Sequence, residues 1–208
     1  MLKSLKRFPM NKKIGMIGSA INAFTVLAFA ICMLIDFGFG SYFICIILAL
    51  SFVMMISAFE AECRTECKAA GKTALVLSAI YATLIVIVYY TQCTSVINDN
   101  LGESAMKILA YKYMGLMFNL DMLGYGIMAL STFFIGLTIN AETKADKALK
   151  ALLLIHGVFF LSCFLMPITG IFANSDGSTS SGGVIALEIW CLYFLPIGIL
   201  SFLHFRRS

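Results

Sequence analysis

The sequence has little charge, and this scarcity limits the kind of protein it can encode. Charged residues make up 12% of the 208 residues and hydrophobic residues 61%, with a mean hydropathy of +0.94. A soluble domain is about half apolar and about one quarter charged. A chain this short has no core large enough to bury such an excess of apolar side chains. The composition therefore excludes an ordinary soluble domain and indicates a protein that is solvated by lipid.

Motifs of familiar enzyme chemistry are absent as well. The sequence has no HExxH zinc motif, no GxSxG nucleophile motif and no glycine-rich phosphate-binding loop. Its two histidines, His156 and His204, lie in different apolar runs, and Cys63 and Cys67 have no second pair of ligands near them in sequence. We therefore expect no metal site, no cofactor and no catalytic residues of the soluble type. These absences favour a protein that is not an enzyme.

Six long apolar runs account for the composition. They cover residues 14–35, 41–59, 73–97, 113–141, 151–172 and 184–205. A helix needs about 20 apolar residues to cross a bilayer, whereas the strands of a membrane barrel alternate apolar and polar residues over about ten. The runs therefore predict an all-α fold, a six-helix transmembrane bundle that forms one domain over residues 1–208. Run 41–59 is the shortest, and it is the one most in need of tilt or bilayer thinning.

The basic residues are divided unequally between the two sides that six crossings define. Of the 15 Lys and Arg residues, 13 fall on the side of the two termini, and Lys107 and Lys112 fall on the other side. Cytoplasmic loops carry the excess of Lys and Arg, so we expect both termini in the cytoplasm. Run 14–35 is longer than the core of a signal peptide and lacks a cleavage site after it, so we expect an uncleaved first span. The net charge of +4 follows from this topology and indicates no nucleic-acid partner.

The loops between the runs have patterns of their own. In the outer segment Asn98–Lys112, Asn100 and Glu103 have the spacing of a capping box, which predicts a short surface helix that is either a plain connection or a lid. The other outer loop, 174–183, has the composition of a flexible linker. The inner loops 61–66 and 141–146 resemble each other in their alternating charges. A duplicated helical hairpin and ordinary solvated helix ends would both produce that likeness.

Apart from His204 at the very end of run 184–205, three Asp, Glu or His side chains lie inside the runs, where a charge costs about 2.5–3.5 kcal/mol by one scale. At 1.5 Å per residue, Asp121 lies roughly 12 Å and Glu188 roughly 6 Å below the outer surface, so both belong to the outer third of the membrane. His156 enters from the inner face, roughly 8 Å deep. It is a candidate proton relay, although a hydrogen bond across a helix pair accounts for it equally simply.

The surroundings of Asp121 suggest an outward-facing polar pocket, with Glu188 at its mouth. Tyr125 shares the helix face of Asp121, and amide groups occur at a similar depth. The alternative is that Asp121 serves as a hydrogen-bonded link between helices while Glu188 extends to the lipid headgroups. The candidate ligand-binding residues are Asp121, Tyr125, Glu188, Asn119 and Gln92.

The stretch Leu120–Gly126, the apolar span that follows it and the closing Phe205-Arg206-Arg207 resemble small uncharacterised six-span integral membrane proteins of bacteria. The resemblance covers about the second half of the chain. It implies the cytoplasmic (inner) membrane of a bacterium, and it brings no activity with it.

Three functions stay open at this point. The first is a protein that binds or transports a small cationic or lipophilic solute, with Asp121 as the anchoring charge. The second is a structural or regulatory subunit that packs against another membrane protein or against a second copy of itself. The third is a membrane-embedded enzyme that uses Asp121 and Glu188 as acid and base on a lipid-like substrate. The expected partners are the lipid bilayer and one of these ligands or proteins.

Overall fold

The structure, a computed structural model, describes residues 9–98, 101–170 and 180–207, and within these ranges every regular element is a helix. The elements are α1 (Met10–Leu34), α2 (Gly38–Glu62), η1 (Thr65–Cys67), α3 (Lys68–Thr91), η2 (Gln92–Val96), α4 (Glu103–Leu109), α5 (Leu116–Thr138), α6 (Lys144–His156), α7 (Phe159–Thr169) and α8 (Ser180–Arg207). Six of the resulting helical segments are long and apolar enough to cross a membrane. The predicted all-α bundle with six candidate spans is therefore confirmed.

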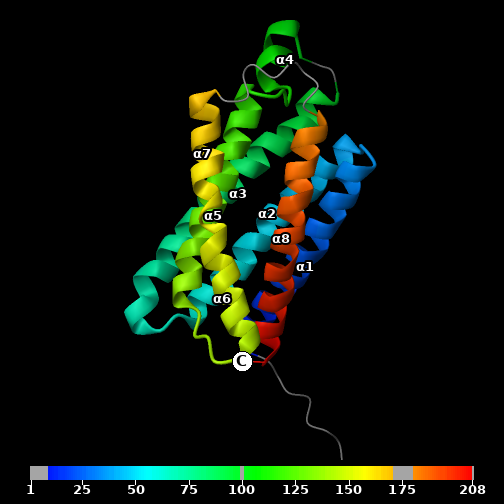
Figure 1. Cartoon of the computed structure of the whole chain (residues 1–208). Coiled ribbons are helices and arrows are strands. Elements are labelled where there is room, and N and C mark those ends of the chain that lie inside the picture. Colours follow the sequence, from blue (N-terminus) through cyan, green and yellow to red (C-terminus); the bar gives the residue numbers. More distant parts are fainter. Residues whose placement is uncertain (1–8, 99–100, 171–179, 208) are drawn as a thin grey trace, which may run out of the picture.

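The long helices run side by side, and both ends of the described chain lie at the same end of the bundle (Figure 1). We call this the C-terminal end, because α8 finishes there, and we call the opposite end the α4 end. Helices suit these sequences because hydrocarbon cannot satisfy backbone N–H and C=O groups, which an α-helix pairs within itself. Large apolar side chains such as Phe24, Leu192 and Ile168 remain exposed on the outside, as lipid contact requires.

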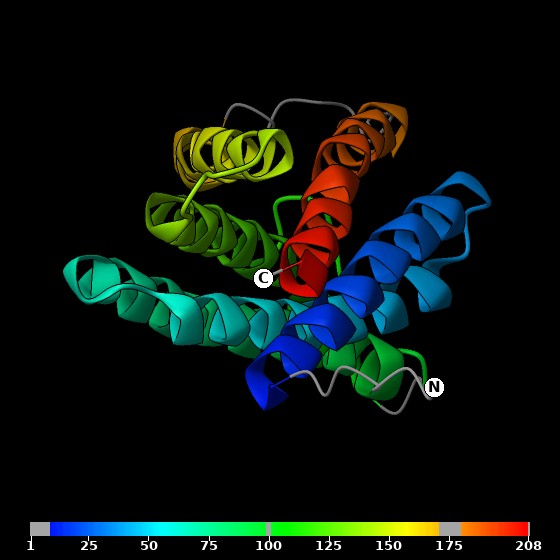
Figure 2. The same cartoon turned by 90° about the horizontal axis from the view of Figure 1, so that it is seen from below.

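The helices follow one another around a ring. α1 packs against α2 and α8, α3 packs between α2 and α5, and α5 supports both α6 and α7. The ring closes where α6 meets α8, a contact that we call the α6–α8 seam (Figure 2). α7 packs mainly against α5. The seam is therefore the main support of α8 on the side away from α1.

Glycines allow close contact on either side of α1. A Cβ atom on Gly18 would lie 2.8 Å from Met54 Cβ of α2, and one on Gly198 of α8 would lie 3.0 Å from Ala23 Cβ of α1. Small residues at such positions let helix backbones approach each other, which replaces the missing hydrophobic driving force between helices in lipid. Inside the ring, Phe52, Tyr81 and Phe194 are fully buried and pack ring against ring.

Several element bounds differ from the apolar runs. Run 41–59 lies within a helix of 25 residues, α2, so the expected shortness of this span is not seen in the helix. The run 151–172 is divided into α6 and α7, because the chain turns more tightly at Gly157 and Val158. A Cβ atom on Gly157 would lie 2.8 Å from Phe133 Cβ, so this break brings α5 unusually close.

The predicted surface helix exists as α4, but its cap differs from the prediction. Its N-cap residue is Gly102, which has no side chain to donate or accept a hydrogen bond, and Asn100 lies outside the described residues. A capping box does occur at the start of α6, between Thr143 and Asp146. The predicted linker 174–183 lies outside the described residues up to residue 179, and α8 begins at Ser180.

Candidate functional site

Asp121 lies on α5 in the half of the bundle nearer the α4 end, and its side chain is buried, with 5% exposed. The Tyr111 hydroxyl donates a hydrogen bond of 2.8 Å to one carboxyl oxygen, Oδ2. The other oxygen, Oδ1, is buried and accepts no hydrogen bond of good geometry among the residues that the structure describes, although the Tyr89 hydroxyl lies near the carboxyl group. A buried polar atom without a partner costs about 1–3 kcal/mol. Asp121 is therefore half-satisfied, and the oxygen without a partner belongs to a group that can carry a full negative charge.

Tyrosine side chains from four segments surround this carboxyl group. The rings of Tyr42 and Tyr89 lie 5.5 Å apart, and each stacks or tilts against Tyr111, at 5.8 and 6.2 Å. Tyr125 completes the group, one helical turn beyond Asp121, and its hydroxyl lies 3.7 Å from Cys45 Sγ. We call Tyr42, Tyr89, Tyr111 and Tyr125 the tyrosine cluster. The face of an aromatic ring carries partial negative charge, so the carboxyl group and these rings offer the same sign of charge in one region.

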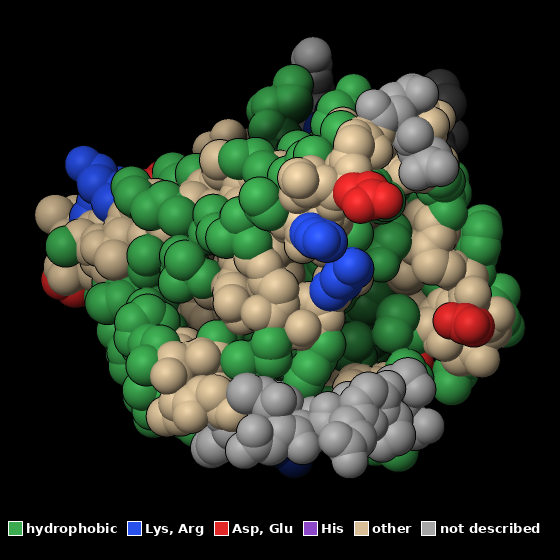
Figure 3. All heavy atoms as spheres, turned by 90° about the horizontal axis from the view of Figure 1, so that it is seen from above, with side chains coloured by type: hydrophobic (Ala, Val, Ile, Leu, Met, Phe, Trp, Pro, Cys, Tyr) green, Lys and Arg blue, Asp and Glu red, His purple; other side chains and the backbone are tan. Residues whose placement is uncertain are grey.

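Gln92 holds in place the chain segment that covers Asp121. Its amide pairs with the backbone of the connecting segment: Nε2 donates to Leu109 O at 2.9 Å, and Oε1 accepts from Tyr111 N at 2.9 Å. We call residues 103–111, which comprise α4 and the two residues after it, the lid. The lid stands over the α4 end, a face with few charged side chains (Figures 1 and 3). Both ends of the Gln92 amide are thus occupied, so it positions Tyr111 instead of facing a ligand.

The lid is attached through irregular backbone on both sides. On one side, Gln92 opens η2, a π-helical turn of the kind that occurs often at functional sites. On the other side, Met114 has a φ of 59°, a left-handed conformation that is uncommon for a residue other than glycine. Such conformations are retained where the surrounding structure imposes them, and they cluster at ligand clamps and switches.

Asn119 lies beside Asp121 in sequence but on another side of α5. Two residues along a helix rotate the side chain by about 200°, so the two groups diverge. The Asn119 amide donates to Met114 O at 3.4 Å. The same residue borders a groove of about 290 Å³ between α5 and α7, whose other lining residues are Leu123, Cys163, Phe164, Pro167 and Ile168. The structure therefore does not bring Asn119 into the tyrosine cluster.

Glu188 is also turned away from Asp121. Trp190, two residues further along α8, points into the bundle and packs its ring 5.4 Å from that of Tyr125. Glu188 therefore lies about 200° around α8 from the side chain that reaches the cluster. One of its oxygens, Oε1, is buried without a hydrogen-bond partner in the described part of the chain. No contact joins Glu188 to Asp121 in the described part of the chain, and its place at the mouth of a pocket stays a prediction.

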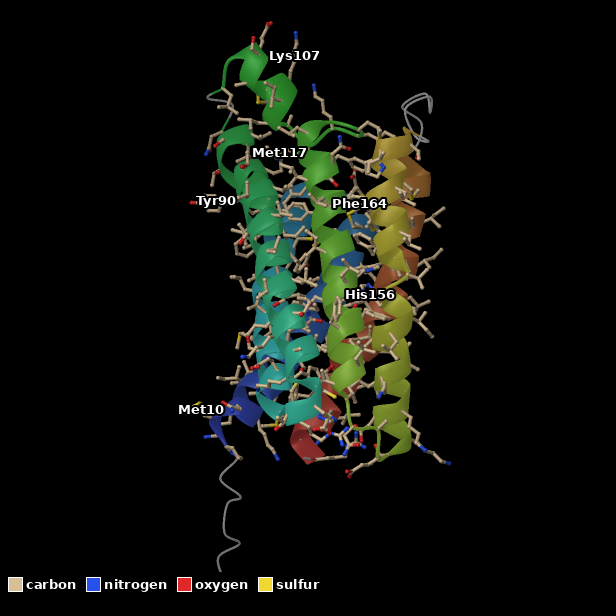
Figure 4. All side chains as sticks on the ribbon, turned by 90° about the vertical axis from the view of Figure 1, so that its left-hand side faces the viewer. Met10, Tyr90, Lys107, Met117, His156 and Phe164 are labelled. Carbon is tan, nitrogen blue, oxygen red and sulfur yellow. The ribbon has the colours of Figure 1, made fainter. Side chains whose placement is uncertain are left out.

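His156 lies at mid-height in the bundle, at the end of α6 (Figure 4), and its side chain is 1% exposed. Trp190 Nε1 donates to its Nε2 at 3.1 Å, so Nε2 carries no proton and Nδ1 does. Nδ1 in turn lies 2.8 Å from Thr132 Oγ1, whose hydroxyl donates to Ala129 O at 2.7 Å. These bonds join α5, α6 and α8 through a neutral imidazole. They account for His156 as a link between helices, and its role as a relay stays a prediction.

A second polar group, which the sequence did not indicate as a site, occupies the C-terminal end. It surrounds a cavity of about 320 Å³ lined by Phe59, Glu62, Arg64, Thr138, Ile139, Asn140, Glu142, Thr143, Asp146, His204 and Arg207. The two similar loops, 61–66 and 141–146, both contribute to this lining. The matching charge pattern of the two loops was the signal in the sequence that could have indicated this polar group. The contribution of His204 and Arg207 from the end of α8 could not be derived from the sequence, because it depends on which helices close the ring.

No family model, curated protein or solved structure matches this chain.

Proposed function

We propose that this membrane protein binds a small organic cation at Asp121, with the tyrosine cluster as an aromatic cage. The half-satisfied, buried carboxyl group among tyrosine rings carries the proposal. An ammonium ion is attracted both by a carboxylate and by the faces of aromatic rings, an arrangement used to recognise quaternary ammonium groups. An ionisable side chain inside the membrane also marks a functional site by default.

Binding requires the lid to move. Asp121 is 5% exposed, and it borders neither the groove beside Asn119 nor the cavity at the C-terminal end. The Tyr111 hydroxyl occupies the side of the carboxyl group that faces the lid. We infer that an incoming cation displaces this hydroxyl while the lid lifts.

The orientation in the membrane is part of the proposal. We place the α4 end outside and both termini in the cytoplasm, because 13 of the 15 basic residues lie on the side of the termini. The site then opens to the outer surface. The inner membrane of a bacterium is the location that the resemblance noted above implies. Transport would further require an opening at the C-terminal end.

The proposal is tested by ligand-induced thermal stabilisation of the purified protein in lipid nanodiscs. The probes are tetramethylammonium, choline and sodium chloride salts at equal ionic strength. We expect the two organic cations to raise the unfolding temperature of the unaltered protein, and we expect Asp121→Asn to abolish this shift. Equal stabilisation by sodium, or an undiminished shift in Asp121→Asn, contradicts the proposal.

Glu188→Gln provides the matched control, because it makes the same chemical change at a carboxyl group that faces away from the cluster. This variant should keep the whole shift. The same pair of variants tests the enzyme hypothesis, which needs Asp121 and Glu188 to act together. The position of Glu188, about 200° around α8 from the Trp190 side chain that reaches the cluster, counts against that hypothesis. Stoichiometric co-purification of another membrane protein would instead favour the subunit hypothesis.

A further inference from the structure

The C-terminal end of the bundle contains a network of charged side chains that links three helices. His204 of α8 lies between two carboxyl groups: its Nδ1 is 2.8 Å from Asp146 Oδ1 of α6, and its Nε2 is 3.2 Å from Glu62 Oε2 of α2. One turn later, Arg207 donates to Asp146 Oδ1 and to Thr143 Oγ1, each at 3.2 Å. We call Glu62, Thr143, Asp146, His204 and Arg207 the latch.

The geometry of the latch implies a charged imidazole. A neutral histidine has one N–H donor, and a carboxylate only accepts hydrogen bonds. Both nitrogens of His204 face carboxyl oxygens, so both contacts are satisfied only when the ring carries two protons. The rings of Phe59 and Phe205 flank the imidazole at 5.4 and 5.5 Å. The other charged groups that line the same cavity are Arg64 and Glu142.

The position of the latch determines how the charge on His204 affects the packing of the helices. The ring of helices closes along the α6–α8 seam. Two further contacts tie this seam nearer its middle: Trp190 donates to His156, and the Tyr193 hydroxyl donates to Leu152 O at 2.7 Å. The latch is the end of the seam that borders the cavity of about 320 Å³. It is thus the part of the seam that aqueous solvent reaches first.

We propose that the latch is a proton-dependent gate. Protonated His204 holds the end of α8 against α2 and α6, and loss of the proton releases α8 and opens the cavity along the seam. The latched state binds the proton more tightly than the open state does. By linkage, the latch therefore holds at lower pH and is lost as the pH rises through the titration of His204. This proposal rests on residues at the end opposite Asp121 and does not depend on cation binding there.

Hydrogen–deuterium exchange of the full chain in nanodiscs tests the gate. After correction for intrinsic exchange rates, we expect the amides of residues 201–207 to exchange about tenfold faster at about pH 9 than at about pH 6. His204→Gln, which is neutral, should exchange fast at both values. His204→Lys, which keeps a positive charge, should exchange slowly at both. Equal exchange of the unaltered protein at the two values would overturn the proposal, as would a pH dependence that survives in His204→Gln.

A neighbouring ion pair provides the control, and NMR provides a second measurement. Glu60, at the same end of α2 as Glu62, forms an ion pair of 3.0 Å with Lys68 of α3. Glu60→Gln removes this pair and should leave the pH dependence intact. The chain has two histidines, so selective ¹⁵N-histidine labelling yields two sets of ring signals. One set should show an imidazolium near neutral pH, and Glu62→Gln should move its titration to lower pH. Two neutral rings at that pH would contradict the gate even if a His204 variant fails to fold.

Discussion

The two carboxyl oxygens of Asp121 have different partners, and this difference distinguishes the residue from His156. Oδ2 accepts from Tyr111, whereas Oδ1 is buried without a partner among the described residues. His156, at a comparable burial, has a partner at each ring nitrogen. Asn22, which links α1 to α2 through Ser51, also has a buried Oδ1 without a partner in the described part of the chain, but an amide carries no charge. We therefore propose ligand binding at Asp121, where the unpaired oxygen belongs to an ionisable group, and a structural link at His156.

The structural role of His156 can be measured through Thr132. Thr132→Val keeps the shape of the side chain but removes the hydroxyl that pairs with His156 Nδ1. The buried N–H of the imidazole then has no acceptor, which should lower the free energy of unfolding by about 1–3 kcal/mol. Denaturation in mixed detergent micelles measures the change. The control is Thr83→Val, because Thr83 is exposed and bonds only to Ala79 O in its own helix. Equal effects of the two substitutions would contradict the link.

The sequence could indicate some of these residues because an ionisable side chain is conspicuous in an apolar run. Asp121, His156 and Glu188 were found in this way. Tyr111 was not, because a tyrosine near the membrane surface is ordinarily an interfacial residue, and its contact with Asp121 depends on the path of the lid. Depth along a helix follows from counting residues, but the direction of Glu188 around α8 requires knowledge of the neighbouring helices.

At the scale of elements, one side chain of η2, the Gln92 amide, makes the hydrogen bonds that hold the lid. The Gln92 side-chain amide donates to Leu109 O and accepts from Tyr111 N. This is the pattern of hydrogen bonds that the backbone of a neighbouring β-strand would make. The helix α4 is short and lies outside the six candidate spans, so its placement relies on this amide and on contacts with η2 and α5. Gln92 was predicted as a ligand because of its depth, whereas the structure shows it holding the lid.

The lid can be tested with a thiol that the chain already contains. Cys45 is fully buried within the tyrosine cluster, beside Tyr125. Gln92→Ala removes two hydrogen bonds to the lid, so we expect a small maleimide to label Cys45 at least about tenfold faster. Labelling at this position is followed by mass spectrometry of the peptide. Thr91→Ala changes an exposed neighbour that bonds only to Ile87 O, and it should leave the rate unchanged. An unaltered rate in Gln92→Ala would show that the lid is held by other contacts.

Breaks in helices were harder to derive from the sequence than the helices themselves. Apolar length was sufficient to predict six spans, but run 151–172 carries Pro167 as its obvious site for a kink. In the structure Pro167 lies inside α7, and the break occurs at Gly157, where α5 comes within reach of the backbone. The missing side chain of Gly157 matters only because Phe133 of α5 packs against this position. A run of apolar residues does not specify which helix will pack against it.

At the scale of the molecule, the tyrosine cluster and the latch lie at opposite ends of the same ring of helices. Trp190 lies between the two regions: its ring packs on Tyr125 on one side, and its N–H donates to His156 in the middle of the α6–α8 seam. If both proposals hold, the bundle has a binding site near one face and a gate near the other, which are the parts that a transporter needs. The orientation of the bundle then decides which face the site serves.

The proposed orientation rests on the distribution of the basic residues and can be tested directly. In cells that express the protein, we expect a membrane-impermeant maleimide to label a cysteine introduced as Lys107→Cys, on the lid, without permeabilisation. Native Cys67, in the turn η1 at the C-terminal end, should react only after permeabilisation. The reason is the share of 13 of the 15 basic residues on the side of the termini, since each resists transfer across the membrane. Mass spectrometry of the two peptides measures both sites in one sample. The opposite pattern would place the tyrosine cluster near the cytoplasmic face, and the proposed cation would then be bound from inside the cell.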